Sequence, residues 1–411
     1  MFTTTPTPVT QISMSEHVSH WFPLADLPGS SGEVIRLETL PVSDGSVTRP
    51  SNAFSTLSHF HAIATICVDS ILGWRAVIGA TPLTEAIEAK QLLEGLSNQL
   101  FKVSLRIPAS SSIPFSTVLL RIYGEHMASF YDRNYELQVF QMLSRMGIGP
   151  KLIANGPTWR LEEFHESRVL TTQMLPNPSV FCQVASQLGR LHKIHRRPEF
   201  PEHFDRTPIT LDRVEKWTRE AQEAVPRLSI EDSVRAAKMM EQMEPEAAGL
   251  AALVHEQSAA GDRLGWNIVF CHNDVQENNI LVTPYGIRLI DFEYANFNFQ
   301  MADVGNFFNE FTMDYVNSVW SPENYPSLEA RRLFATVYLS EYLERPVMDT
   351  ESLDAFLEAA EIGSQLSHLL WGMWSLVRAQ QHADTFGAFN FVGYAKFRFD
   401  SYLAKKAQLG W

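Results

Sequence analysis

The chain has 411 residues, of which 45% are hydrophobic and 19% charged, so it can form two or three domains with a substantial core. Its formal net charge of -14 argues against a nucleic-acid-binding protein, because such proteins usually present a basic face. The three cysteines, Cys67, Cys182 and Cys271, are far apart and lack zinc-site spacing, which fits a reducing compartment.

The N-terminal stretch MFTTTPTPVTQ lacks the charged segment and apolar run of a secretory signal. The stretch nearest to a membrane span, His61 to Ala80, is interrupted by Asp69 and Arg75 and falls short of the apolar continuity that a span needs. We therefore expect a cytoplasmic protein. Residues 1–60, rich in Thr, Ser, Pro and Gly, are predicted to be a poorly ordered or extended leader.

The apolar spacing between Ala62 and Ile78 predicts an amphipathic helix. The following stretch, TPLTEAIEAKQLLEG at 81–95, starts with good helix-capping residues but ends like a strand, and periodicity leaves both readings open. Strands are predicted at QLFKVSLRI (99–107) and STVLLRIYG (116–124), on either side of a proline-containing loop.

Further along the chain, the pattern predicts a helix over 134–146, strands at 150–154 and 158–164, and a helix over 179–193. Helices are also predicted over 211–260, with breaks at Pro226 and Pro245, and over about 327–406. The sequence thus predicts an α+β fold of two lobes: a β-rich lobe at 61–164 and a mainly helical lobe at 165–411, with a cleft where the lobes meet.

A polar cluster, FCHNDVQENNIL at 270–281, lies between two predicted buried strands. It contains His272-x-Asp274-x4-Asn279, and a second predicted strand ends at Asp291. Transfer of a phosphoryl group to an alcohol needs a carboxylate that orients and deprotonates the hydroxyl, and oxygen ligands for Mg²⁺. Asp274 fits the first role, and Asn279 and Asp291 fit the second. The alternative is that these residues only cap a loop and a turn.

Three segments resemble the choline/ethanolamine kinase family: FCHNDVQENNILV, LIDFEYANFNFQMADVGNFFNEFTMDY and LLWGMWSLVRA. A weaker resemblance extends from about Leu93 to Tyr402. The resemblance implies a protein-kinase-like fold that uses ATP and Mg²⁺. One departure is Asn278, where the family usually has glycine, and we expect a backbone conformation there that Asn tolerates.

The resemblance assigns 90–94 to a strand and makes GLSN at 95–98 the loop over the nucleotide phosphates; no P-loop motif is present. It implies that Arg121 binds phosphate with Glu136 as its ion-pair partner, and that the backbone at 162–165 holds the adenine. The nucleotide-binding residues implied are Gly95, Leu96, Ser97, Asn98, Arg121, Glu136, Glu162, Glu163, Phe164 and His165.

In the catalytic loop, the resemblance implies that Asp274 is the base, that Gln276 lies near the transferred phosphate, and that Asn279 and Asp291 bind Mg²⁺. His272 is expected to position the loop by hydrogen bonding. Asp303 is expected to tie the loop down, which is a structural role.

A quaternary ammonium group is held by aromatic faces and a carboxylate, because its nitrogen cannot donate a hydrogen bond. Residues of these types match the family's choline pocket, although the two tryptophans, three apart on one helix, would by themselves predict core packing. The substrate-binding residues implied are Tyr294, Glu310, Tyr315, Trp371, Trp374 and Tyr394.

The resemblance implies ATP-dependent phosphorylation of choline to phosphocholine, the first step of the CDP-choline route to phosphatidylcholine. The alternatives are an ethanolamine kinase or a dual choline/ethanolamine kinase and, more remotely, an aminoglycoside-type phosphotransferase or a pseudokinase scaffold. The expected partner is a small amino alcohol, with no nucleic acid and no membrane span. The sequence leaves the oligomeric state open, including a homodimer.

Overall fold

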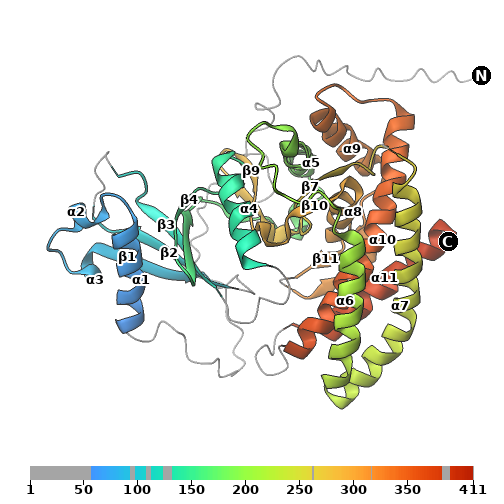
Figure 1. Ribbon diagram of the computed structural model, residues 1–411, viewed down its shortest axis with the longest axis horizontal. Helices are drawn as coiled ribbons and strands as arrows, with labels where there is room; N and C mark the ends of the chain where they lie inside the picture. The colour runs from blue at the N-terminus through green and yellow to red at the C-terminus, as the bar shows by residue number, and fades with distance from the viewer. Residues whose placement is uncertain are drawn as a thin grey trace, which may run out of the picture. The chain divides into compact units, whose positions relative to one another are not determined.

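The structure is a computed structural model that describes residues 57–92, 98–107, 113–123, 132–261, 263–315, 317–381 and 389–410 (Figure 1). Of the predicted leader, only 57–60 are therefore described. Gly95, Leu96 and Ser97 of the predicted phosphate-binding loop also lie outside the described residues.

The first lobe is built on an antiparallel sheet with the strand order β1-β2-β3-β5-β4. The register places Phe101 beside Leu120 and Leu120 beside Leu161, so one face of the sheet is apolar and buried. The strands are β1 (Ile87–Leu92), β2 (Asn98–Leu105), β3 (Thr117–Tyr123), β4 (Leu152–Asn155) and β5 (Trp159–Glu163).

Helices α1 to α3 precede this sheet along the chain (Figure 1). They share its core, in which Trp74 is fully buried. The single helix predicted from Ala62 to Ile78 is wrong: α1 (Leu57–Ser70) ends early and α2 (Trp74–Ile78) begins after Gly73. Gly73 has φ 87°, a left-handed conformation that a continuous helix cannot contain. The ambiguous stretch at 81–95 contains both structures, because the one-turn α3 (Leu83–Ala86) leads directly into β1.

Helix α4 (Arg133–Arg145) follows β3, close to its predicted bounds. The side chain of Asp132 caps it by accepting hydrogen bonds from the backbone N–H groups of Asn134 and Tyr135, at 2.8 and 3.3 Å. Glu136, in the first turn, is buried and therefore faces the protein interior.

The second lobe is mainly helical, with small antiparallel sheets that carry its loops. β7 pairs with β10, β11 with β12, and β8 lies between β6 and β9. The strands are β6 (Arg168–Val169), β7 (Ile268–Cys271), β8 (Ile280–Thr283), β9 (Gly286–Leu289), β10 (Asn296–Phe299), β11 (Met313–Asp314) and β12 (Val319–Trp320).

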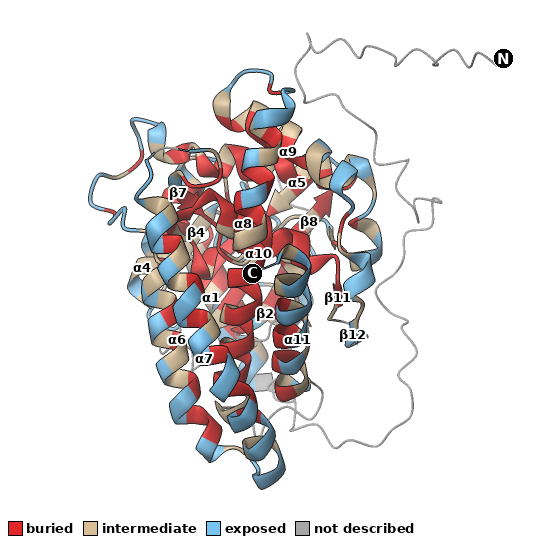
Figure 2. Ribbon diagram, turned by 90° about the vertical axis from the view of Figure 1, so that its right-hand side faces the viewer, coloured by how far each residue is buried: buried red, intermediate tan, exposed pale blue. Residues whose placement is uncertain are grey.

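The helices of this lobe surround α10, which is buried along most of its length (Figure 2). The long helices are α5 (Pro178–His192), α6 (Thr210–Ala224), α7 (Ile230–Ser258), α8 (Gln300–Glu310), α9 (Leu328–Leu343), α10 (Thr350–Gln381) and α11 (Phe391–Leu409). The 3₁₀ turns are η4 (Thr172–Met174), η5 (Ile194–Arg196), η6 (Val225–Arg227), η7 (Glu277–Asn279), η8 (Phe292–Tyr294) and η9 (Pro322–Asn324).

The two predicted helix breaks have different outcomes. Pro226 lies in η6, between α6 and α7, as expected. The predicted break at Pro245 is wrong, because this proline lies inside the continuous helix α7. Met240, Met243 and Ala247 on either side of it are buried in the lobe core, and this packing holds the helix together despite the lost backbone donor.

Helices α8 and α10 approach each other closely. A Cβ atom at Gly363 would lie 1.9 Å from the carbonyl oxygen of Met301, and one at Gly305 would lie 2.2 Å from the backbone nitrogen of Ser364. Larger residues would force the helices apart. Within the described ranges, no helix is both long and apolar enough to cross a bilayer.

Candidate active site

The loop that carries His272, Asn273 and Asp274 follows β7 directly. Because β7 pairs with β10, this loop lies beside the turn that follows Asp291. Asn273 adopts φ 64°, and its side chain spans the two segments: Nδ2 donates to the carbonyl oxygen of Tyr294 at 3.1 Å, and Oδ1 accepts from Asn298 at 2.8 Å. The backbone therefore turns sharply at Asn273 and presents Asp274 to the site.

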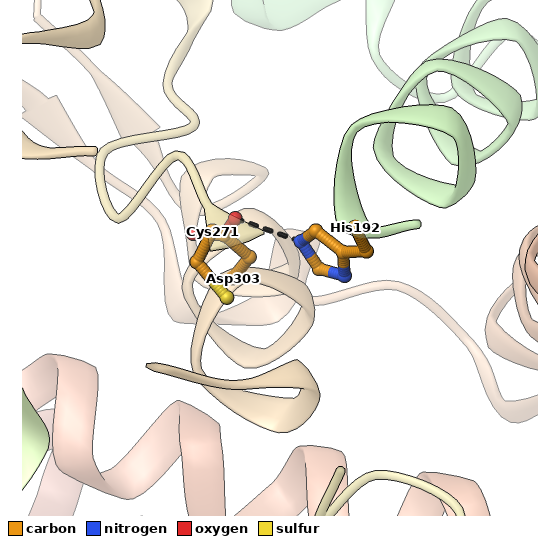
Figure 3. Close-up of side chains that lie close together, drawn as sticks. All are labelled: His192, Cys271 and Asp303. Carbon is orange, nitrogen blue, oxygen red and sulfur yellow. Dashed lines mark hydrogen bonds and ion pairs between the residues drawn. The ribbon is translucent and has the colours of Figure 1, made fainter. Parts of the chain in front are cut away.

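Asp303, on α8, holds this loop in place through hydrogen bonds to its backbone, which is the structural role expected of it. Its two carboxylate oxygens accept hydrogen bonds from the backbone N–H groups of His272 and Asn273, both at 2.6 Å. Nε2 of His192 lies 3.0 Å from the same carboxylate (Figure 3). These bonds keep the pKa of Asp303 below its ordinary value even though burial raises it, so the carboxylate stays ionised.

His192, Cys271 and Asp303 place potential metal-ligand atoms close together (Figure 3). All of these atoms are already in hydrogen bonds: Nδ1 of His192 with Tyr338 at 2.6 Å, and Sγ of Cys271 with the carbonyl oxygen of Phe299 at 3.5 Å. Burial also raises the pKa of the Cys271 thiol well above its ordinary value. The cluster is therefore a hydrogen-bonded support for the loop.

His272 also positions the loop. Its Nε2–H donates to the carbonyl oxygen of Ile290 at 2.9 Å, which connects the loop to the residue before Asp291. Burial lowers the pKa of His272, so the ring is neutral.

Asp274 lies at the centre of the site. Nδ2 of Asn279 donates to both the carbonyl oxygen and Oδ2 of Asp274, each at 2.9 Å, which fixes the carboxylate and leaves the amide oxygen of Asn279 available as a ligand. The pKa of Asp274 is raised well above its ordinary value, first by burial and then by the negative charges of Glu310 and Asp291. These three carboxylates therefore lie close enough to interact electrostatically.

Asp291 adopts φ 60° and ψ 64°, and its Oδ1 lies 3.4 Å from Nη1 of Arg121. Glu293 joins the same group: burial and then the charge of Asp291 raise its pKa well above the ordinary value. Mg²⁺ prefers oxygen ligands such as these carboxylates. A bound cation would also offset the repulsion between their negative charges. Asn279 and Asp291 fit the role of ligands, and Glu293 is a further candidate to which the sequence assigned no role.

The expectation for Asn278 is wrong. Asn278 lies within η7, while the left-handed conformations near the site occur at Asn273 and Asp291. Oε1 of Gln276 caps η7 by accepting from the backbone and side-chain nitrogens of Asn278, at 3.4 and 3.0 Å. In this arrangement Gln276 stabilises the loop, and its predicted contact with phosphate stays a prediction.

The buried charges of the first lobe are paired differently from the prediction. Arg121 donates to Oε1 of Glu162 at 3.0 Å, while Glu136 pairs with Arg160 on β5. Arg160 also donates to Glu162 at 2.6 Å and lies 4.0 Å from the ring centroid of Phe140. The predicted role of Glu136 as the direct partner of Arg121 thus passes to Glu162, because β5 lies next to β3 in the sheet.

This pairing also gives the Glu162 side chain a defined role, where the sequence assigned importance only to its backbone. Burial alone would raise the pKa of Glu162, but Arg160 and Arg121 lower it below the ordinary value. A chain of ion pairs therefore runs from α4 to the second lobe, in the order Glu136, Arg160, Glu162, Arg121 and Asp291.

The other predicted nucleotide-binding residues lie along the edges of the same sheet. Asn98 begins β2 opposite Tyr123. Glu163 ends β5, and its side chain accepts from the backbone N–H of Lys151 at 3.3 Å. Phe164 lies under Nζ of Lys102 at 4.3 Å, and burial lowers the pKa of His165. None of these contacts tests whether the backbone at 162–165 binds adenine, so that role stays a prediction.

Three of the predicted substrate residues form one aromatic group. The ring centroids of Trp371 and Trp374 are 5.3 Å apart, and those of Tyr294 and Trp371 are 5.6 Å apart. Nε1 of Trp374 donates to the Tyr294 hydroxyl at 3.1 Å, while Nε1 of Trp371 donates to Asn306 at 2.9 Å. Trp371 is buried and Trp374 only partly so, which makes Trp374 the more accessible indole.

The other three, Glu310, Tyr315 and Tyr394, form a second group around Arg398. The Tyr315 and Tyr394 hydroxyls lie 3.1 Å apart, and Glu310 accepts from Nη2 of Arg398 at 3.2 Å. Burial raises the pKa of Glu310 to about 7, although the charge of Arg398 opposes this. The structure thus brings a carboxylate and two tyrosines together, and Asp274 is near enough for Glu310 to shift its pKa.

Asn306 and Ser367 connect the two groups. Oδ1 of Asn306 accepts from both Ser367 and Trp371, and its Nδ2 donates to the carbonyl oxygen of Val275 in the catalytic loop at 3.2 Å. Ser367 in turn accepts from Nη1 of Arg398 at 3.3 Å. The aromatic residues, the buried carboxylate and the catalytic loop therefore belong to one hydrogen-bonded network.

Two arginines near the site were not predicted. Arg398 lies one helical turn after Tyr394, a spacing that could have indicated their contact. Arg213, on α6, lies 5.2 Å from the ring centroid of Trp217 and 5.6 Å from that of Tyr294, and burial lowers its pKa to about 10. A surface groove between α4 and residues 197–204 contains none of the predicted site residues.

The lobes and the catalytic loop define a protein-kinase-like phosphotransferase fold, and comparison with known proteins specifies the family. The family model described as choline/ethanolamine kinase matches residues 89–403. The chain therefore belongs to the choline/ethanolamine kinase family.

Individual relatives agree with this assignment. A choline/ethanolamine kinase of Rattus norvegicus is 31% identical over 337 residues, which cover 77% of this chain and 79% of the relative. The structure of a choline kinase from Cryptosporidium parvum Iowa II matches at 35% identity and a TM-score of 0.71, over 85% of this chain and 96% of that one. A Plasmodium vivax ethanolamine kinase has the same fold, with a TM-score of 0.64 at 21% identity, over 86% and 91% of the two chains.

Proposed function

We propose that this chain catalyses the ATP-dependent phosphorylation of choline to phosphocholine, a reaction that supplies phosphatidylcholine synthesis. The observation that carries the proposal is the buried carboxylate of Glu310, which lies among tyrosines and close enough to Asp274 to shift its pKa. A quaternary ammonium group needs aromatic faces and a negative charge, and the alcohol two carbons away needs a base.

In this reaction Asp274 accepts the proton of the substrate hydroxyl while its oxygen attacks the γ-phosphorus in line, the bond to the bridging oxygen breaks and ADP leaves. The hydrogen bonds from Asn279 hold the carboxylate in one orientation, and Asp303 holds the loop that carries it. The amide oxygen of Asn279 and the carboxylate of Asp291 would hold Mg²⁺, which neutralises charge on the phosphates when bound. Glu293 is a third candidate ligand.

The nucleotide would bind between the lobes, with its phosphates near Arg121. Burial alone would lower the pKa of Arg121, but Asp291 and Glu162 raise it above its ordinary value, so the guanidinium stays charged. A permanent cation at this position can bind the phosphate oxygens of ATP. Family membership supports the use of ATP by this chain.

Ethanolamine is the second candidate, either as the preferred substrate or together with choline. The observation in its favour is Oε2 of Glu310, which is buried and has no hydrogen-bond partner among the described residues. A primary ammonium could donate to this oxygen, whereas a trimethylammonium group could not.

The test is an assay of ATP-dependent phosphate transfer to choline, ethanolamine and a kanamycin-type aminoglycoside under identical conditions. We expect kcat/KM to be highest for choline and no turnover of the aminoglycoside. The Asp274→Ala variant controls for contaminating kinases and should be inactive with every substrate. A preference for ethanolamine would establish the second candidate, and no turnover of either amine by the wild-type protein would reject the proposal.

A further inference from the structure

Arg398 and Glu310 form an ion pair that is removed from water, with the side chains only 1% and 2% exposed. The guanidinium holds one carboxylate oxygen, Oε1, through Nη2 at 3.2 Å. The other oxygen, Oε2, has no hydrogen-bond partner within the part of the chain that is described. The Tyr315 hydroxyl is near enough to this carboxylate to lower its pKa, but Oε2 itself stays available to a ligand that can donate to it or carry a positive charge.

The same guanidinium holds two further groups. Nε donates to the hydroxyl of Tyr394 at 2.8 Å, and Nη1 donates to Oγ of Ser367 at 3.3 Å. Tyr394 lies against the Tyr315 hydroxyl, and Ser367 is bonded to Asn306, which in turn holds Trp371. Arg398 therefore connects the carboxylate to both aromatic groups of the proposed amine site. It lies outside the three segments that carry the strongest resemblance to the family.

We propose that Arg398 is a positioning residue that sets amine specificity: it balances the charge of Glu310, so that the site favours a quaternary ammonium over a primary one. This inference rests on the proposed function, since it concerns the amine site of that reaction.

The reasoning compares how the two cations lose their hydration. A primary ammonium must replace its hydrogen bonds to water with acceptors of the protein, and it depends on a strong negative charge to do so. A trimethylammonium group makes no such bonds and gains from aromatic faces and apolar contact. Because Arg398 already offsets much of the Glu310 charge, the primary ammonium loses more of its attraction than the quaternary one does.

The deciding measurement is the ratio of kcat/KM for choline to kcat/KM for ethanolamine, determined on one preparation of each variant. The ratio does not depend on the fraction of active enzyme, so a partly unfolded variant still gives a valid result. Arg398 helps to hold down the pKa of Glu310, so the variants are compared across a pH series that extends well above 7, where the carboxylate is ionised. At the alkaline end of the series we expect Arg398→Met to lower the ratio by about tenfold, which corresponds to about 1.4 kcal/mol. Arg398→Lys keeps the charge but cannot make all three hydrogen bonds of the guanidinium, so it should lower the ratio by clearly less than Arg398→Met does.

Two further variants separate charge balance from stability. Glu310→Gln combined with Arg398→Met removes both charges, and the ratio should return towards that of wild type. Arg331→Met is the matched control: Arg331 pairs with Glu361 in the same lobe, so this variant should lower the melting temperature and leave the ratio unchanged.

The outcomes are distinct. If the wild-type protein phosphorylates neither amine, the proposed function fails. If wild type is active but Arg398→Met leaves the ratio unchanged or raises it, the specificity role of Arg398 is wrong while the proposed function stands. An equal fall of the ratio in Arg398→Lys and Arg398→Met would also overturn it, because the lysine retains the charge.

Discussion

Replacing Asp303 with Asn tests how the catalytic loop is held in place. The change preserves size but removes the negative charge and one acceptor oxygen. In wild type the carboxylate accepts from two backbone N–H groups at 2.6 Å each and contacts His192 at 3.0 Å, all in a fully buried environment. An Asn side chain can satisfy only one of the two backbone donors well.

The expected loss of stability follows from these bonds. A buried donor left without a partner costs about 1–3 kcal/mol, and hydrogen bonds to a charged acceptor contribute about 1.5–3 kcal/mol each. We therefore expect Asp303→Asn to lower the free energy of unfolding by about 3–5 kcal/mol, the upper range for a single substitution. Displacement of Asp274 by the loosened loop should also lower kcat of the folded protein by about a hundredfold.

Urea unfolding followed by tryptophan fluorescence, together with kcat on the same preparations, measures both effects. Asp354→Asn is the matched control, because Asp354 bonds to Arg332 in a pair that is 43% and 40% exposed, and its loss should cost less than about 1 kcal/mol. An unfolding midpoint for Asp303→Asn equal to that of Asp354→Asn, or an unchanged kcat, would refute the reasoning.

Four further outcomes are expected. Asp274→Ala should lower kcat by at least about a hundredfold while ATP-analogue affinity stays nearly unchanged, and retention of a tenth of wild-type kcat would remove Asp274 from the role of base. Asp291→Asn should be strongly impaired and partly rescued by raised Mg²⁺; a Mg²⁺ titration identical to wild type would contradict metal binding there. Trp374→Leu should lower kcat/KM for choline by about tenfold and kcat/KM for ethanolamine by less. Trp371→Leu should have the same effect and should also lower the melting temperature. If both variants lower the melting temperature but leave the choline KM unchanged, the indoles are core residues. The pKa of Glu310 is raised to about 7, so the carboxyl is neutral below that pH, and choline KM should rise as pH falls through 7 in wild type but not in Glu310→Gln.

The catalytic loop could be predicted from the sequence because its chemistry is local. His272, Asp274 and Asn279 lie within eight residues, with the short strand β7 before them and the short strand β8 after them. Residues this close along the chain remain close in the structure, because consecutive Cα atoms are only about 3.8 Å apart. The lobes could be predicted for the same reason, from apolar periodicity within each element.

Contacts between distant elements could not be predicted in the same way. The pairing of Glu136 with Arg160 depends on β5 lying next to β3, which residue types alone do not determine. Arg398 reaches Glu310 only because α11 packs on α10 and α10 on α8. The backbone conformation that Asn tolerates better than most residues occurs at Asn273 and not at Asn278, and the residue type alone does not distinguish neighbouring asparagines.

The pair between Glu136 and Arg160 has a consequence for control of activity. It joins α4 to the central sheet through side chains that are 5% and 1% exposed, and separating such a pair costs about 3–5 kcal/mol. A conformation with α4 swung outward would then be populated in about one molecule in a hundred or fewer, before any other contact is counted. Outward movement of this helix is therefore poorly suited to be an on–off switch here.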